Sequence, residues 1–372
     1  MLKHQYECVH NSYCLYIVTL VCNKKGTVLY TVGNVKSEGS NFFVAMSFLA
    51  VFLLSALRNK TVGVDTVSYI KYYETVQELS WEGLIKGEWN HHFFTTEKGF
   101  MILEKICGDL MVPTQLFIAL CAGIFVYGIY KLVSTYIESN VIVSVFSFLA
   151  VGSYLLSINV LRQGIGVGLC CIAWVELKKG NWKRFVIGVL LACTFHVSCC
   201  VFFLAVIFEK IPAGRKSIII STIVMMVVGF VGAAFLPIIL RWFPIYAVRY
   251  GNGRWKINEA NGIVIVWVIV LAIILLSAFR LDWSKKEHHI DFEVMLFSLC
   301  YVSINIIGLS FDGAQRLSML FQPFLILLFS KSCGLWSGAT KSIYTTGVVA
   351  GMIVLFLKAA STAQYAYLPF WA

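Results

Sequence analysis

The sequence is poor in charged residues, which make up only 13% of its 372 positions, whereas 59% are hydrophobic. A soluble domain carries about 25% charged and roughly 45–50% apolar residues. So large an apolar excess cannot be buried in one core surrounded by water. The sequence also lacks a run of like charges, although its formal net charge is +11. These absences exclude a soluble enzyme and a small secreted domain, and the dispersed basic residues exclude a nucleic-acid binder.

Long stretches without charge take the place of the missing polar residues. Residues 110–130, 141–161 and 217–240 contain no charged side chain, and an apolar helix needs roughly 20 residues to cross a bilayer. We therefore predict an all-α polytopic integral membrane protein with about 10 or 11 transmembrane helices. No repeat or Pro-rich linker divides it, so residues 1–372 form one transmembrane domain. The uncharged runs place the spans near 6–22, 41–57, 113–133, 140–157, 162–177, 217–240, 262–279, 293–310, 316–330 and 343–357.

Residues 185–208 are long enough to cross the membrane once, but lysine and arginine residues flank the segment on both sides. Short cytoplasmic loops carry the excess of basic residues, so a re-entrant hairpin that turns near Thr194–Ser198 suits both flanks better than a simple crossing. Non-helical backbone at membrane depth is tolerated only where protein or a water-filled cavity surrounds it. The hairpin therefore predicts a cavity. It also gathers on one side of the membrane Arg58, Asp65, Glu97, Arg162, His196, Arg249, Asp312 and Arg316.

Two polar loops are rich in aromatic and basic residues. We expect residues 58–112 to form a large extracytoplasmic loop with interfacial helices, and residues 241–261 to form a second extracytoplasmic loop. Aromatic rings in such loops belong to an interfacial belt, or they stack on sugar rings. The candidate sugar-binding residues are Tyr69, Tyr73, Trp89 and Tyr246.

The twelve cysteines do not predict a metal site. No Cys-x-x-Cys pair occurs, most of the cysteines lie inside apolar stretches, and Cys193 with His196 alone is too little for zinc. In such stretches cysteine acts as a small hydrophobic residue. We expect no metal.

Arg162 is the most conspicuous single residue, because it follows and precedes long uncharged runs. A cation at that depth is costly unless it meets an anion, a carbonyl group or water. It either snorkels to lipid headgroups or binds phosphate, whose oxygens match the donors of a guanidinium fork. The nearby Gly164, Gly166 and Gly168 would allow close approach of a phosphate, or close packing of helices.

His196 is similarly isolated, with no ionisable neighbour in sequence for eleven residues on either side. It is either a neutral side chain bonded to Thr194 or Ser198, or a general base, because imidazole titrates near neutrality.

The other polar candidates lie near helix ends. Asp312 and Arg316 have the spacing of an ion pair within one helix. Arg58 and Asp65 flank a glycine turn and are solvated by default, and Glu97 would favour the first turn of a helix through the helix dipole.

The order of these motifs resembles that of the EpsG-like and Wzy-type bacterial polysaccharide polymerases, over residues 50–320. The motifs that carry the resemblance are Arg58, Gly63-Val64-Asp65-Thr66, Tyr69, Glu97-Lys98-Gly99-Phe100, Asn159, Arg162-Gln163, His196-Val197-Ser198 and Arg316-Leu317-Ser318.

The resemblance implies a GT-C-like integral glycosyltransferase of the bacterial cytoplasmic (inner) membrane with a periplasmic active face. Such enzymes transfer a glycan from undecaprenyl diphosphate to a sugar hydroxyl of another lipid-linked unit, as in O-antigen and lipopolysaccharide biosynthesis. No cofactor, nucleotide sugar or metal is expected. The implied partners are the undecaprenyl-diphosphate-linked oligosaccharide, membrane lipid and a chain-length regulator protein.

Residue chemistry assigns roles within that reaction. Arg162 and Arg316 are the first candidates for binding the diphosphate, since fixed cations stabilise its growing charge, and Arg58 and Arg249 come second. The proton acceptor is one of His196, Asp65, Glu97 or Asp312, with His196 favoured. Two alternatives stay open, namely an O-antigen ligase or other lipid-linked glycosyltransferase, and a lipid-linked oligosaccharide flippase or transporter.

Overall fold

The computed structural model describes residues 38–63, 65–87, 97–137, 140–240, 242, 257–310, 312–360 and 367–372. These residues form an all-α fold, and the one β-type contact among them is an isolated bridge between Arg58 and Pro369. The helices are α2 (Glu38–Ala56), α3 (Thr66–Gln77), α4 (Trp81–Lys86), α5 (Lys98–Asp109), α6 (Thr114–Tyr136), α7 (Val141–Ala150), α8 (Ser153–Asn159), α9 (Leu161–Lys178), α10 (Trp182–Phe195), the 3-10 helix η2 (Val197–Phe203), α11 (Leu204–Phe208), α12 (Arg215–Leu240), α14 (Ile257–Arg280), α15 (His288–Ile307), α16 (Asp312–Ser318), α17 (Gln322–Cys333) and α18 (Gly338–Ala360).

Two predicted spans are each broken into two helices. The span at 140–157 divides into α7 and α8 at Gly152, whose φ of +85° is a left-handed conformation that favours glycine. The span at 316–330 divides into α16 and α17, and Gln322 at the start of α17 donates to the carbonyl of Val151. The two breaks therefore contact each other, which a pattern of apolar residues does not show.

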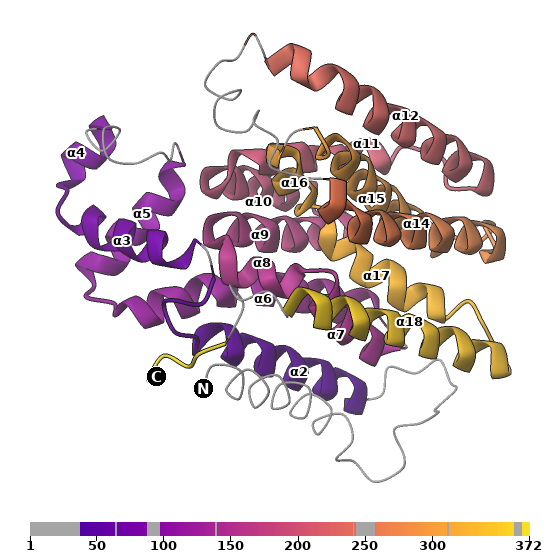
Figure 1. Cartoon of the computed structure of the whole chain (residues 1–372), viewed down its shortest axis with the longest axis horizontal. Coiled ribbons are helices and arrows are strands. Elements are labelled where there is room, and N and C mark those ends of the chain that lie inside the picture. Colours follow the sequence, from indigo (N-terminus) through magenta and orange to yellow (C-terminus); the bar gives the residue numbers. More distant parts are fainter. Residues whose placement is uncertain are drawn as a thin grey trace.

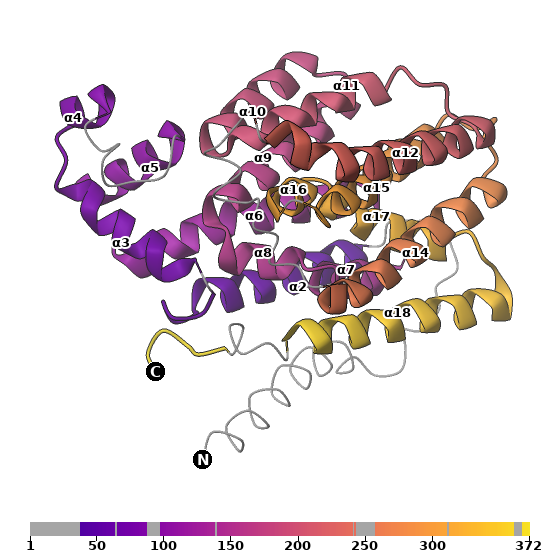
Figure 2. The same cartoon turned by 45° about the horizontal axis from the view of Figure 1, so that its top comes forward.

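Helix α9 lies in the interior of the bundle, between α6 and α10 (Figures 1 and 2). It approaches α6 closely, because a Cβ atom added to Gly168 would lie 2.7 Å from the carbonyl oxygen of Ile124. A Cβ atom added to Gly166 would lie 2.6 Å from the Cys199 sulfur on the other side of the helix. Gly166 and Gly168 are thus explained by helix packing.

Residues 185–208 fold as a hairpin, as the flanking charges predict. Helix α10 runs antiparallel to α9, η2 and α11 then return, and His196 stands at the turn between them. Lys178 at the end of α9 bonds Glu209, the residue after α11, at 2.9 Å. Both flanks of the hairpin therefore lie at the same end of the bundle.

Helices α3, α4 and α5 project from the opposite end of the bundle, at the left of Figure 1. They occupy much of the segment predicted as a loop with interfacial helices. Helix α5 packs Phe100 and Met101 inward and leaves the apolar side chains of Ile102 and Ile106 exposed. Of the second predicted loop, 241–261, only Trp242 and the start of α14 belong to the described residues.

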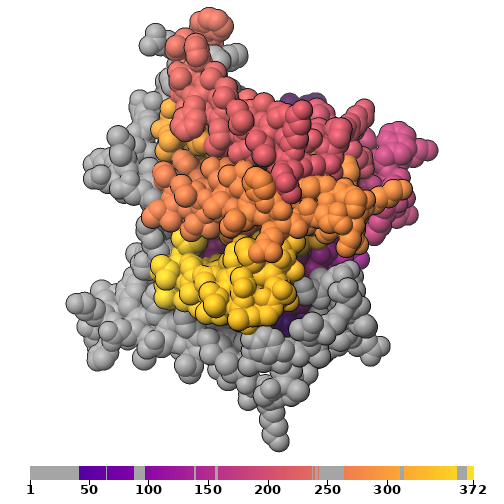
Figure 3. Space-filling view, turned by 90° about the vertical axis from the view of Figure 1, so that its right-hand side faces the viewer, coloured from indigo at the N-terminus to yellow at the C-terminus, as the bar shows by residue number. Residues whose placement is uncertain are grey.

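Membrane-spanning character is clear from length and hydropathy. Among the described residues, the helical segments long and apolar enough to cross a bilayer are Thr114–Tyr136, Arg215–Leu236, His288–Ile307 and Gly338–Leu357. Helices α12 and α18 expose apolar side chains along most of their length, and Figure 3 shows α12, the α14–α15 region and α18 in neighbouring bands at the surface. Such large apolar surfaces suit lipid rather than water.

Candidate functional site

The predicted site residues that the structure describes gather at the bundle end that carries α3–α5. At their centre Arg162, in the first turn of α9, forms an ion pair with Glu97, with 2.5 Å between Nη1 and Oε2. The two side chains are 16% and 11% exposed. Glu97 precedes α5, but its side chain makes no capping hydrogen bond, so it pairs with Arg162 instead of capping.

Tyr69 lies against the same guanidinium. The Cζ atom of Arg162 is 5.8 Å from the centre of the Tyr69 ring, and Tyr69 meets Phe100 edge to face. Burial raises the pKa of the Tyr69 hydroxyl, and the Arg162 cation opposes that rise. The charge of Asp65, which is half-buried just before α3, also raises the pKa of Tyr69. Tyr69 therefore faces the Arg162 cation directly.

His196 reaches the site at the tip of the hairpin. Its Nδ1 atom is 2.6 Å from Ser198 Oγ, and the charges of Glu97, Arg162 and Arg316 all act on the ring. The start of α5 docks on this tip, because a Cβ atom added to Gly99 would lie 2.3 Å from Thr194 Oγ1. The glycine of the Glu97-Lys98-Gly99 motif is needed for that close approach.

Arg316, at the end of α16, brings a second guanidinium to the site. The side chain of Gln163 donates to the backbone carbonyl of Arg316, which ties α16 to α9. The Arg316 guanidinium is exposed and forms no ion pair with any side chain that the structure describes. Asp312 begins α16, and its side chain lies outside the described part of the chain.

The site keeps unmet hydrogen-bonding capacity. Within the described residues, the buried Nε atom of Arg162 and the buried Oε1 atom of Gln163 have no hydrogen-bond partner. Buried polar groups are normally paired, so an unpaired donor needs an explanation. A guanidinium with an unused donor, at the same end of the bundle as a second guanidinium without an ion pair, is suited to bind a multivalent anion.

Other predicted residues are placed differently. Arg58 is 0% exposed, and its guanidinium donates to backbone carbonyls. Tyr73 is buried, stacks on Phe117 with ring centres 4.5 Å apart, and donates to the carbonyl of Val112. Trp89, Tyr246 and Arg249 lie outside the described residues.

Sequence reasoning missed Glu104. It is 1% exposed on α5, and its Oε1 atom has no hydrogen-bond partner among the described residues. Burial raises its pKa well above the usual range, and the cation of Arg162 opposes the rise. Glu104 follows Glu97 by seven residues and lies among apolar residues of α5, and a second carboxyl group in that position is the signal that could have found it.

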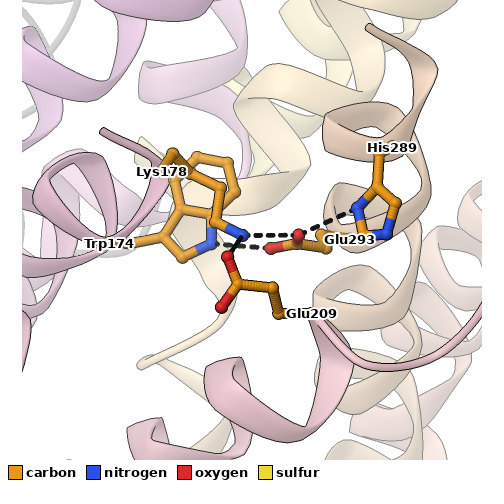
Figure 4. Close-up of polar contacts among 5 residues, drawn as sticks. All are labelled: Trp174, Lys178, Glu209, His289 and Glu293. Carbon is orange, nitrogen blue, oxygen red and sulfur yellow. Dashed lines mark hydrogen bonds and ion pairs between the residues drawn. The ribbon is translucent and has the colours of Figure 1, made fainter. Parts of the chain in front are cut away.

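A second polar cluster lies at the far end of α9 (Figure 4). Glu293 is 0% exposed and accepts hydrogen bonds from Lys178 at 2.6 Å, Trp174 at 3.1 Å and His289 at 3.2 Å. Lys178 also bonds Glu209 at 2.9 Å. This cluster joins α9, α15 and the chain after α11, and both carboxylate oxygens of Glu293 are used.

The chain was compared with curated proteins, solved structures and protein families. Neither the curated proteins nor the solved structures include a match to it. A search of protein families matches the EpsG family over residues 41–371. That match covers most of the chain and all of the site described above, so the protein belongs to the EpsG family.

Proposed function

We propose that this membrane protein is a polysaccharide polymerase, such as an O-antigen polymerase. It would transfer an undecaprenyl-diphosphate-linked glycan to a sugar hydroxyl of another lipid-linked repeat unit. The active face would be periplasmic, in the bacterial cytoplasmic membrane, and a chain-length regulator would be its protein partner. The observation that carries the proposal is that Gln163, the neighbour of Arg162, bonds the backbone of Arg316 at one end of the bundle, while Arg162 keeps an unpaired donor among the described residues.

The charges favour an anionic leaving group. The Glu97 carboxylate, with its Oε2 atom 2.5 Å from Nη1 of Arg162, balances the charge of that guanidinium and fixes the orientation of its plane. Arg316 has no ion pair among the described side chains. Arg316 therefore supplies a positive charge that pairs with no described carboxylate, which suits a diphosphate, and guanidinium groups bind phosphate oxygens through paired donors. Because a preorganised cation stabilises charge as it develops, the gain is largest in the transition state.

The reaction needs one bond broken, one bond formed and one proton accepted. The bond from the anomeric carbon to the diphosphate oxygen breaks, and undecaprenyl diphosphate leaves with the bonding electrons. The acceptor hydroxyl oxygen forms the new glycosidic bond and releases its proton. If Nδ1 of His196 donates to Ser198, the Nε2 atom presents a lone pair that takes this proton.

Reconstitution tests the proposal. Purified protein in liposomes that contain lipid-linked repeat units should produce a ladder of longer glycans. Arg316→Lys keeps the charge but removes the fork, and should lower ladder formation by about 10²-fold. Arg280→Lys is the matched control, because the Cζ atom of that guanidinium lies 4.1 Å from the centre of the Trp336 ring, away from the site. A full ladder from the Arg316→Lys protein would refute diphosphate binding by Arg316.

The same assay separates the alternatives. An O-antigen ligase would form product only after a lipid A-core acceptor is added. A flippase or transporter would move the lipid-linked unit across the bilayer without making a glycosidic bond. Either result would replace the polymerase proposal.

A further inference from the structure

Arg58 does not present its guanidinium to the surface. The side chain is 0% exposed and donates to the carbonyl of Ser55 and, at 3.2 Å, to the carbonyl of Ile158. The carbonyl of Ile158 lies 100 residues along the chain, so this contact joins the end of α2 to the end of α8.

The Ile158 carbonyl stands at the junction where α8 ends and α9 begins. Val160 interrupts the helical backbone there, with φ −113° and ψ 74°, and the last carbonyls of a helix have no partner within the helix. The Thr66 hydroxyl, which has one proton to donate, lies 3.0 Å from the same oxygen and 2.9 Å from the carbonyl oxygen of Val62, so it bridges the two carbonyl groups. Gly63 packs against it so closely that an added Cβ atom would lie 2.8 Å from the Ile158 oxygen.

The segment that carries Arg58 is itself fixed. The side chain of Gln115 donates to the Arg58 carbonyl at 3.1 Å. The amide of Asn59 donates to the carbonyl of Leu368 at 2.7 Å, and the amide of Phe370 donates to the carbonyl of Leu57 at 2.8 Å. Arg58 is therefore anchored on both sides of its own backbone.

We infer that Arg58 and Thr66 are positioning residues, which hold the α8–α9 junction so that Arg162 points at Glu97 and the diphosphate. This inference rests on the proposed function. Arg162 follows Val160 by two residues, and the first turn of α9 closes on the same residue, since the Gly164 amide donates to the Val160 carbonyl at 2.7 Å. A shift of the Ile158 carbonyl would rotate this turn and move the Arg162 guanidinium.

Thr66→Val tests the inference with little change in shape. It should lower kcat about tenfold, the size expected from one lost hydrogen bond, and leave KM for the lipid-linked donor nearly unchanged. Thr66→Ser should restore kcat. Backbone amides in 159–166 should exchange hydrogen faster in the Thr66→Val protein. Thr75→Val is the control, because the Thr75 hydroxyl donates to a carbonyl of its own helix at 2.8 Å and is exposed.

A double-mutant cycle with Arg58→Lys decides between positioning and direct binding. If both residues hold one carbonyl, the double variant should be no slower than the worse single variant, because groups that share a partner are not additive. Additive losses, or a rise in KM on Arg58→Lys with kcat intact, would overturn the inference. Unchanged exchange and unchanged kcat in the Thr66→Val protein would overturn it as well. Faster exchange in a protein that makes no polymer would instead reject the proposed function and leave the role of Thr66 at the junction in place.

Discussion

A basic residue lies at each end of α9, but the two differ in how completely their buried polar groups are paired. The helix has 18 residues, so its ends are about 27 Å apart. At the C-terminal end Lys178 meets two carboxylates, and Glu293 uses both of its oxygens. At the N-terminal end Arg162 meets one carboxylate and keeps a buried donor without a partner among the described residues. A buried network in which every polar group has a partner holds helices together, whereas one with an unpaired donor can still bind a ligand. We call the Lys178 end of α9 the closed end and the Arg162 end the open end.

The largest expected effect comes from the open end. Arg162→Lys keeps the positive charge but loses the fork, and should lower polymer formation by about 10²–10³-fold at a normal protein level. Polymer length and protein amount are measured in the same cells. Arg184→Lys is the control, since that side chain is 73% exposed at the opposite end. Full-length polymer from the Arg162→Lys protein would show that the guanidinium fork at the open end does not bind the diphosphate.

His196 should have the next largest effect. His196→Gln should slow turnover by about 10²-fold and should also change the pH profile. A histidine that accepts a proton must be neutral, so wild-type activity should fall as pH drops through its pKa. The variant should lack that limb. A pH–rate profile that keeps the same limb in the His196→Gln protein would argue against a role as base.

The closed end should control stability and not turnover. Lys178→Met leaves Glu293 buried without its cation, and removing one member of a buried pair costs about 3–5 kcal/mol. Thermal unfolding in detergent measures that loss. Turnover per folded molecule should stay close to wild type, and Lys178→Met combined with Glu293→Leu should recover much of the stability. A drop in turnover with unchanged unfolding would place the closed end in the reaction.

Glu104 should have the smallest effect, and the effect depends on pH. Its pKa is raised by burial, so the folded protein holds a proton that the unfolded chain releases. The resulting stability is complete below the ordinary pKa of a glutamate and is lost as pH rises through the raised value. Hydrogen exchange in α5 should therefore speed up in the wild type as pH rises through the raised pKa of Glu104. It should be nearly independent of pH, apart from the intrinsic rate, in the Glu104→Gln protein. The same pH response in both proteins would contradict a protonated Glu104.

Much of the fold could be predicted from local patterns. The expected spans at 113–133, 217–240 and 262–279 correspond to α6, α12 and α14, because uncharged length is readable from neighbouring residues. The flanking charges were enough to predict the hairpin at 185–208. The breaks at Gly152 and before Gln322 were missed, since they depend on a contact between the two breaks.

The site was predicted less completely. Arg162, His196 and Arg316 were found because ionisable groups beside apolar segments are rare. The role of Glu97 was open between a helix cap and a partner, and geometry decided for the partner. Arg58 ranked behind Arg162 as a diphosphate ligand and was expected to be solvated, but the structure buries it against backbone carbonyl groups.

Sequence by itself determined that this chain lies in a membrane, where its spans fall and which few polar residues interrupt them. Each of these follows from hydrophobicity summed over neighbouring residues. Only the tertiary structure decided that Arg162 pairs with Glu97, 65 residues away, and that Arg58 donates a hydrogen bond to a carbonyl group 100 residues away. Such contacts depend on how helices rotate and pack against one another, and no local stretch of sequence contains that information.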